Sequence, residues 1–107
     1  MRETIINGTA GILPDALAQL PDEALLGMMT QHNEQALGAL YDRYGRLVYS
    51  LALHITDNLV TAERVTEAVF EHVWTAADAI RAAYAPGHGW IIAITRQHTA
   101  GERRPHR

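Results

Sequence analysis

The feature that most constrains the fold is the spacing of apolar residues between Thr61 and Ile80. Such residues recur there at steps of three and four positions, which places them in one stripe along an α-helix. Phe70 and Trp74 widen this stripe. The pattern predicts a single helix over 61–80 that buries one face and exposes a polar one. The buried stripe comprises Ala62, Val65, Val69, Val73, Ala76 and Ile80, and the polar face Glu63, Arg64, Glu67 and Glu71.

A second amphipathic helix is predicted from about Glu34 to Ile55, with Asp42, Arg43 and Arg46 turned away from the core. Asn33 is suited to cap its start, and Asn58 or Thr61 to cap the helix that follows. Two glycines inside it, Gly38 and Gly45, each lower helix propensity by about 1 kcal/mol relative to alanine. The predicted apolar stripe comprises Leu37, Leu40, Tyr44, Leu47, Val48, Leu51 and Ile55.

The remaining segments are predicted from helix caps and breakers. Residues 1–20 are weakly patterned and predict a loosely structured N-terminal arm, in which 15–20 could form one or two helical turns. Asp22 is predicted to be the N-cap of a helix that ends near His32. Pro86, Gly87 and Gly89 predict a loop over 84–89. The apolar run that follows could be a strand, but the absence of other strand signals favours a final helix.

The predicted fold class is therefore all-α. Residues 21–107 are expected to form a compact bundle of about three to four helices, with two long antiparallel helices and a final helix across them. The 107 residues allow one domain, and no apolar run approaches the roughly 18–20 residues that cross a bilayer. The N-terminus is too short and polar for a signal peptide, and there is no cysteine. These features predict a cytoplasmic protein.

Several function classes lack support in the sequence. There is no glycine-rich phosphate loop, no nucleophile motif and no converging carboxylate pair, so no enzyme activity is predicted. The six histidines form no recognisable ligand set, so neither a metal nor a cofactor is expected. We likewise expect no small-molecule substrate and no membrane partner.

The charge distribution is uneven. The net charge is −3, yet all nine basic residues are arginines, and four of them lie in the last twelve residues with a single acid. An acidic body with a basic end indicates either a contact with a polyanion or a solvated tail. The sequence leaves both interpretations open.

Four motifs in order carry a family resemblance. They are L-P-D-E-A-L-L at 20–26, L-Y-D-R-Y at 40–44, A-E-R-V-T-E-A-V-F-E-H-V-W at 62–74 and G-W-I-I-A-I-T-R-Q at 89–97. Their order and spacing resemble region 2 of extracytoplasmic-function sigma factors of the sigma-70 family. The resemblance covers about residues 20–104 and implies a role in transcription initiation. No region 4, the domain that reads the −35 element, is expected within these 107 residues.

The resemblance implies two binding surfaces. One would bind the β′ clamp helices of RNA polymerase, and the other would hold the melted, single-stranded −10 promoter element. A flipped base requires stacking and hydrogen-bonding groups, and its backbone requires cations. The implied polymerase-binding residues are Asp42, Arg43, Glu63, Arg64, Glu67 and Glu71. The implied DNA-binding residues are Tyr84, His88, Trp90, Arg96, Gln97, His98, Arg103 and Arg104.

Departures from the family pattern support an alternative. Arg64 stands where the family usually has Asp, Glu67 replaces Gln, and Ala68 replaces Glu. In the last helix, Gln97 replaces Asn and Gly101 replaces Asp. The alternative is a sigma-like interaction module that binds a regulator, such as an anti-sigma factor, without initiating transcription. A third interpretation is a helical adaptor that dimerises.

The two tryptophans allow two interpretations. Trp74 and Trp90 could stack on DNA bases, but their helical positions favour packing against the core.

Overall fold

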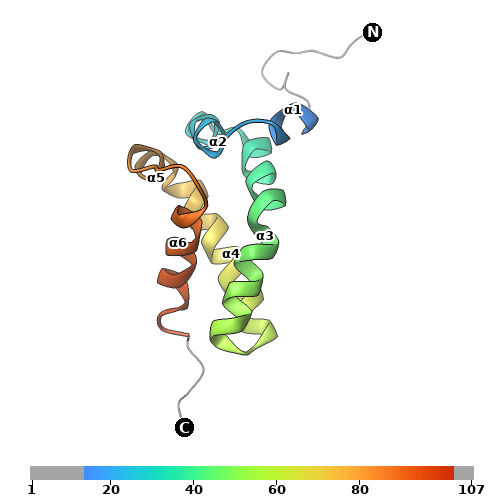
Figure 1. Ribbon diagram of the computed structural model, residues 1–107, viewed down its shortest axis with the longest axis vertical. Coiled ribbons are helices and arrows are strands. Elements are labelled where there is room, and N and C mark those ends of the chain that lie inside the picture. Colours follow the sequence, from blue (N-terminus) through green and yellow to red (C-terminus); the bar gives the residue numbers. More distant parts are fainter. Residues whose placement is uncertain (1–13, 103–107) are drawn as a thin grey trace.

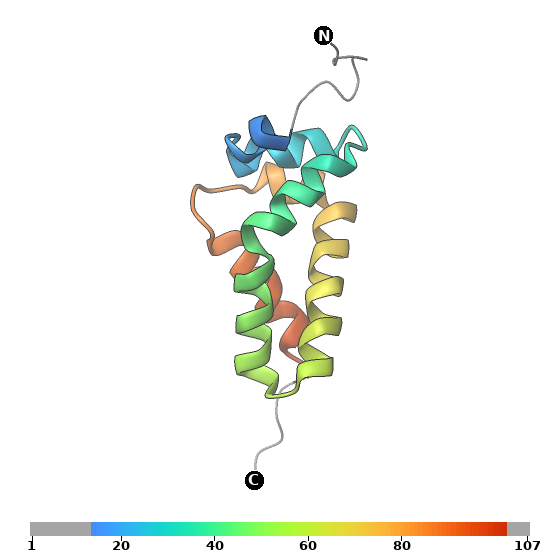
Figure 2. The same cartoon turned by 90° about the vertical axis from the view of Figure 1, so that its right-hand side faces the viewer.

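In a computed structural model, residues 14–102 of the chain are described and form six α-helices without a strand in this range (Figure 1). The helices α3 and α4 form a long antiparallel hairpin, and α6 runs alongside it (Figure 2). The shorter α1, α2 and α5 gather at one end (Figure 1). Their bounds are α1 Pro14–Ala18, α2 Asp22–Met29, α3 Glu34–Thr56, α4 Leu59–Thr75, α5 Ala77–Ala82 and α6 Gly89–Thr99. The predicted all-α fold is confirmed, and the apolar run that begins at Trp90 is helical as favoured, with the helix ending at Thr99.

Local side-chain caps fix where the two long helices begin. The side chain of Asn33 accepts a hydrogen bond from the Ala36 backbone N–H at 3.2 Å. Asn58 accepts one from the Thr61 N–H at 2.8 Å. Between α3 and α4, Asp57 adopts the left-handed conformation with φ 55° and allows a tight reversal. Both predicted asparagine caps are confirmed.

One hydrophobic core lies between α2, α3, α4 and α6. The predicted stripe of α4 is buried from Ala62 to Val73. In α3, Leu40 and Val48 are buried, whereas Leu47 is exposed, so its assignment to the stripe was wrong. Trp74 and Trp90 are half-buried and pack against the core, in the manner favoured by the sequence. The largest fully buried apolar side chains are Leu25, Leu26, Leu40, Val48, Val69, Val73 and Ile91.

The prediction of one continuous helix over 61–80 was wrong. The helix α4 ends at Thr75, and α5 begins at Ala77 after a break at Ala76, whose φ and ψ are −112° and 22°. No proline or glycine causes this break. The change of direction brings α5 against α2, where the guanidinium of Arg81 lies over Gly27. The break is therefore a product of packing and carries no local signal.

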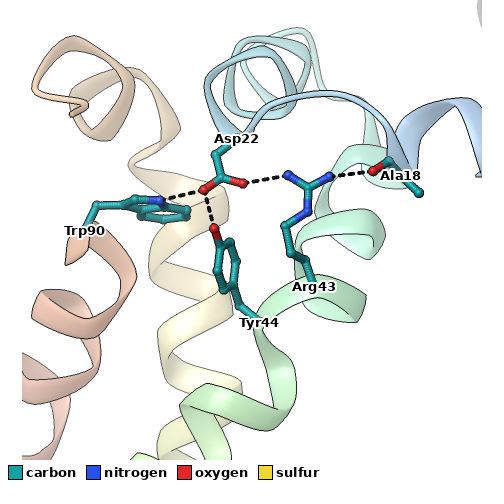
Figure 3. Close-up of polar contacts among 5 residues, drawn as sticks. All are labelled: Ala18, Asp22, Arg43, Tyr44 and Trp90. Atoms are coloured by element: carbon teal, nitrogen blue, oxygen red, sulfur yellow. Dashed lines mark hydrogen bonds and ion pairs between the residues drawn. The ribbon is translucent and has the colours of Figure 1, made fainter. Parts of the chain in front are cut away.

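The predicted role of Asp22 as an N-cap was also wrong. Pro21 occupies the N-cap position without a side-chain bond, and Asp22 is the first residue of α2. Its carboxylate is buried and points into the bundle, toward α3 and α6 (Figure 3). The helix then ends at Met29, slightly earlier than expected, and His32 adopts a positive φ of 64°. Within the described residues, no helix is long and apolar enough to cross a membrane.

Candidate functional site

A groove with acidic walls and an aromatic floor runs between α3 and α4. Two adjoining depressions share Tyr41, Asp42 and Glu67 and together form this acidic groove. Its floor includes the edge-to-face pair of Tyr41 and Phe70, whose ring centroids lie 5.0 Å apart. The acids that line it are Glu34, Asp42, Glu63, Glu67 and Glu71, and none forms an ion pair within residues 14–102.

Four of the six residues predicted to bind polymerase meet in the acidic groove, and the two arginines do not. The four are Asp42, Glu63, Glu67 and Glu71. Arg43 turns toward α2 and pairs with Asp22 at 2.6 Å, so the expectation that it faces away from the bundle was wrong. Arg64 is exposed, but its guanidinium donates to both carboxylate oxygens of Glu102, at 3.0 and 3.2 Å. Among residues 14–102, Arg46 is the one basic side chain that lines the groove, so acids still predominate there.

The Arg64–Glu102 pair joins α4 to the end of α6. The hydrogen bonds from Arg64 hold the pKa of Glu102 below its usual range, and Glu102 in turn raises the pKa of Arg64. The family-atypical arginine is therefore neutralised by the chain itself. Its positive charge is directed to α6 and away from the acids of the groove.

The Asp22 cluster, formed by Asp22, Arg43, Tyr44 and Trp90, is the most densely bonded polar site in the described part of the chain (Figure 3). One carboxylate oxygen accepts from Arg43 at 2.6 Å. The other accepts from the Tyr44 hydroxyl at 2.5 Å and from the Trp90 indole N–H at 3.0 Å. Arg43 also donates to the Ala18 carbonyl at 3.2 Å. One buried charge thus connects α1, α2, α3 and α6.

Sequence reasoning missed this cluster as a unit. Its members lie 21, 22 and 68 positions from Asp22, so no local periodicity joins them. The one available signal was chemical. An aspartate that precedes an apolar run by two positions is expected to need partners if it is buried. Burial and the hydrogen bond to Asp22 raise the pKa of Tyr44, which keeps its hydroxyl a donor.

The α5–α6 loop, residues 83–88, leads into the first turn of α6, which carries Trp90 of the Asp22 cluster. Tyr84 is half-buried, whereas His88 is exposed and occupies the N-cap position of α6. Burial raises the pKa of Tyr84, and the negative charges of Asp22 and Glu23 raise it further. Trp90, in the first turn of α6, packs edge to face on Tyr44 with centroids 5.9 Å apart. Two of the predicted DNA-binding residues, Tyr84 in the loop and Trp90 just after it, therefore pack against the core.

The outer face of α6 carries Arg96 and Gln97, which are both exposed. Arg96 borders a shallow groove against α3, formed with Leu51, His54, Ile55 and Thr99. No carboxylate lines this groove, in contrast to the acidic groove on the other side of α3. Polyanion contacts are electrostatically favoured here and disfavoured there.

His98 lies elsewhere, in the contact between α6 and α4. Its Nε2 is 2.8 Å from Nδ1 of His72, and it is half-buried. Burial and the neighbouring His72 lower the pKa of His98. The predicted residues Arg103 and Arg104 lie outside the described residues. Among residues 14–102, no group of three or more histidine, aspartate or glutamate side chains could hold a metal ion.

A comparison with known protein families shows which family this helical bundle belongs to. The family model described as Sigma-70 region 2 matches residues 40–104, which is more than half of the chain. The chain belongs to the sigma-70 region 2 family. The matched segment of this region 2 domain includes most of α3, all of α4 to α6 and most of the acidic groove, but leaves out α1, α2 and the groove residue Glu34.

A curated relative points to the same branch of the family. The ECF RNA polymerase sigma factor SigK of Mycolicibacterium vanbaalenii is 29% identical over 91% of this chain and 48% of its own length. The chain thus spans about half the length of that relative. No solved structure matches this chain significantly. The predicted resemblance to region 2 of an extracytoplasmic-function sigma factor is confirmed.

Proposed function

We propose that this chain acts in transcription initiation in the cytoplasm as the region 2 domain of a sigma factor. The acidic groove would bind the β′ clamp helices of RNA polymerase, and the α5–α6 loop with α6 would bind the melted −10 element. The observation that carries this proposal is membership of the sigma-70 region 2 family. Binding alone accounts for the role, so no bond chemistry is invoked.

The chemistry of the acidic groove supports a helical, basic partner. Exposed aromatic surface flanked by carboxylates that have no ion pair within residues 14–102 suits a helix that presents arginines or lysines along one side. Tyr41 is 52% exposed, which leaves its ring available as an apolar anchor. We assign the contact to Asp42, Glu63, Glu67 and Glu71. Arg43 and Arg64 are assigned structural roles in the bundle instead.

The chemistry of the loop and of α6 supports contact with single-stranded DNA. The loop offers the Tyr84 ring and the His88 imidazole, and α6 offers Arg96 and Gln97. Aromatic groups bind unstacked bases, and arginine neutralises phosphate with release of counterions. Arg103 and Arg104 follow in the sequence and would add two further cations for phosphate contacts. Trp90 and His98 are assigned to holding α6 in place.

Charge reversal tests the polymerase-binding surface. Glu67→Arg should weaken binding to isolated β′ clamp helices by at least about tenfold, because like charges would then face each other. Asp78→Arg is the matched control, since Asp78 is exposed on α5 outside the groove. Titration by isothermal calorimetry gives both dissociation constants. Equal affinities for the two variants would rule out the assigned groove.

Salt dependence tests the DNA-binding surface. Binding to a labelled single-stranded −10-like oligonucleotide should fall steeply with salt, and Arg96→Ala should reduce the slope by about 0.7 per lost phosphate contact. Arg46→Ala is the control, because Arg46 is equally exposed but lines the acidic groove. Fluorescence anisotropy at several salt concentrations measures the slopes. If the chain does not bind the oligonucleotide at low salt, the proposed binding of the −10 element is wrong.

The Arg64–Glu102 pair favours a second candidate, the sigma-like module that binds a regulator. At position 64 the usual acid of the family is replaced by a base that the chain itself neutralises. A charge-swapped variant, Arg64→Asp with Glu102→Arg, keeps a pair but restores the family's acid. If only this variant binds the clamp helices, and the unaltered chain binds an anti-sigma factor instead, the second candidate holds.

A further inference from the structure

The end of the α5–α6 loop that leads into α6 is held by a carboxylate from a distant part of the chain. Trp90, two residues beyond the loop, donates its indole N–H to Asp22 at 3.0 Å (Figure 3). Tyr84, near the start of the loop, lies within the electrostatic influence of the same carboxylate. Asp22 thus bonds one flank of the segment assigned to base capture and acts on Tyr84 through its charge alone.

The loop between these flanks has few other anchors. Ala85, Pro86, Gly87 and His88 are all exposed, and His88 makes no hydrogen bond through its side chain within residues 14–102. Gly87 adopts φ 101°, a conformation that side chains rarely permit. A segment of this kind samples many shapes unless its ends are fixed.

Asp22 itself is held firmly. It is only 5% exposed, and Arg43 and Tyr44, which bond it from α3, would keep its position even if Trp90 were released. Hydrogen bonds to a buried carboxylate are among the stronger polar interactions in proteins. The carboxylate is therefore a fixed point against which α6 and the loop can be set.

We propose that Asp22 is a positioning residue for the α5–α6 loop, preparing it to capture an unstacked base of single-stranded DNA. This inference rests on the proposed function. Fixing the loop before binding lowers the entropy cost of capture. It also assigns a functional part to α2, which lies outside the family-matched segment 40–104.

Two variants test this role in the full-length chain. Asp22→Asn removes the charge while nearly preserving shape, and Trp90→Phe removes only the indole N–H and keeps an aromatic ring. Glu102→Gln is the control, because it breaks the other long-range ion pair, remote from the loop. Circular dichroism verifies that each variant is folded. Trp90→Phe keeps the hydrogen bonds of Arg43 and Tyr44 to Asp22, so this variant can still test the inference if Asp22→Asn does not fold.

Hydrogen–deuterium exchange without DNA gives the first measurement. Amides of residues 84–90 should exchange about tenfold faster in Trp90→Phe and Asp22→Asn, since one hydrogen bond to a charged group is lost. Exchange in α3 and α4 should match that of the control. Unchanged exchange of the loop in a folded variant would overturn the inference, whatever the behaviour toward DNA.

Binding gives the second measurement. A single-stranded −10-like oligonucleotide should bind the two variants about tenfold more weakly, while affinity for the β′ clamp helices stays within about twofold of the unaltered chain. Parallel loss of both affinities would indicate a merely structural role and overturn the inference. The affinity of the unaltered chain for the oligonucleotide is measured first. If that chain does not bind, the proposed function itself is contradicted, and the variants are not compared.

Discussion

At the scale of single residues, the two glycines of α3 differ in what surrounds them. A Cβ added at Gly38 would meet no atom within 4 Å, whereas one at Gly45 would lie 3.3 Å from the ring of Tyr41. Gly45 therefore makes room for an aromatic side chain of the acidic groove. Gly38 only weakens the helix. The sequence marked both glycines equally, and their packing separates them.

This difference predicts opposite responses to alanine. Gly38→Ala should raise the free energy of unfolding by about 0.5–1 kcal/mol, because alanine has the higher helix propensity and meets no obstacle. Gly45→Ala should gain less or lose stability, since the Tyr41 ring must shift. Urea denaturation of the two variants measures both. Equal stabilisation would show that the Tyr41 ring adjusts without cost.

Tyr44 provides a second prediction at the residue scale. Tyr44→Phe removes one of three donors to the buried Asp22 carboxylate and should lower the free energy of unfolding by about 1.5–3 kcal/mol. Tyr49→Phe is the control, because no hydrogen bond of the Tyr49 hydroxyl is present within residues 14–102. Thermal unfolding followed by circular dichroism compares the two. A similar loss of stability in both variants would show that the Tyr44–Asp22 hydrogen bond does not stabilise the fold.

At the scale of elements, two polar contacts join α4 to α6 and to the residues just after it, about two helical turns apart along α4. The Arg64–Glu102 pair is exposed, whereas the His72–His98 contact is half-buried. The histidine contact requires that one ring nitrogen donate and the other accept. It is therefore lost when both imidazoles carry a proton.

The histidine contact predicts a stability that falls in acid. Because the pKa of His98 is lowered in the folded state, the unfolded chain binds more protons below about pH 6.5. The stabilisation is full above that pH and is lost as the pH falls through the lower, folded-state pKa. Urea denaturation between pH 7 and 5 should show this decrease.

Two substitutions test whether His98 causes this loss of stability in acid. His98→Gln should flatten the dependence of the unfolding free energy on pH. His54→Gln should leave it unchanged, because His54 is exposed on α3. An identical pH profile in His98→Gln and the unaltered chain would place the effect in other groups.

At the scale of the whole molecule, α3 supports both candidate surfaces. It packs against α4 beneath the acidic groove and against α6 beneath the groove that Arg96 borders. The two surfaces therefore share one core, and a loss of core packing should affect both. A defect in one surface residue should affect only that surface.

A matched pair of leucines tests this dependence. Leu40→Ala should lower the free energy of unfolding by about 2–5 kcal/mol, a large part of the roughly 5–15 kcal/mol typical of a domain. Binding to clamp helices and to DNA should then decline together on warming. Leu59→Ala should change stability by under about 0.5 kcal/mol, because Leu59 is 62% exposed. Comparable losses of unfolding free energy in Leu40→Ala and Leu59→Ala would mean that Leu40 is not a core residue.

Much of the fold and part of the candidate site could be predicted from the sequence. Helical periodicity marked the buried stripe of α4, and the asparagine caps marked the starts of α3 and α4. The same periodicity put Asp42, Glu63 and Glu67 on polar faces. These features depend on residues within about four positions of one another, the range over which helical geometry acts.

Only the tertiary structure decided which distant groups meet. It broke the predicted helix at Ala76 so that α5 reaches α2, and it buried Asp22 beneath Tyr44 and Trp90. It also withdrew Arg43 and Arg64 into ion pairs and left the acids of the groove unpaired. Such contacts join residues 21 to 68 positions apart. The contacts of Asp22 form because a buried charge must find a partner, and helix packing, rather than local pattern, determines which partners are within reach.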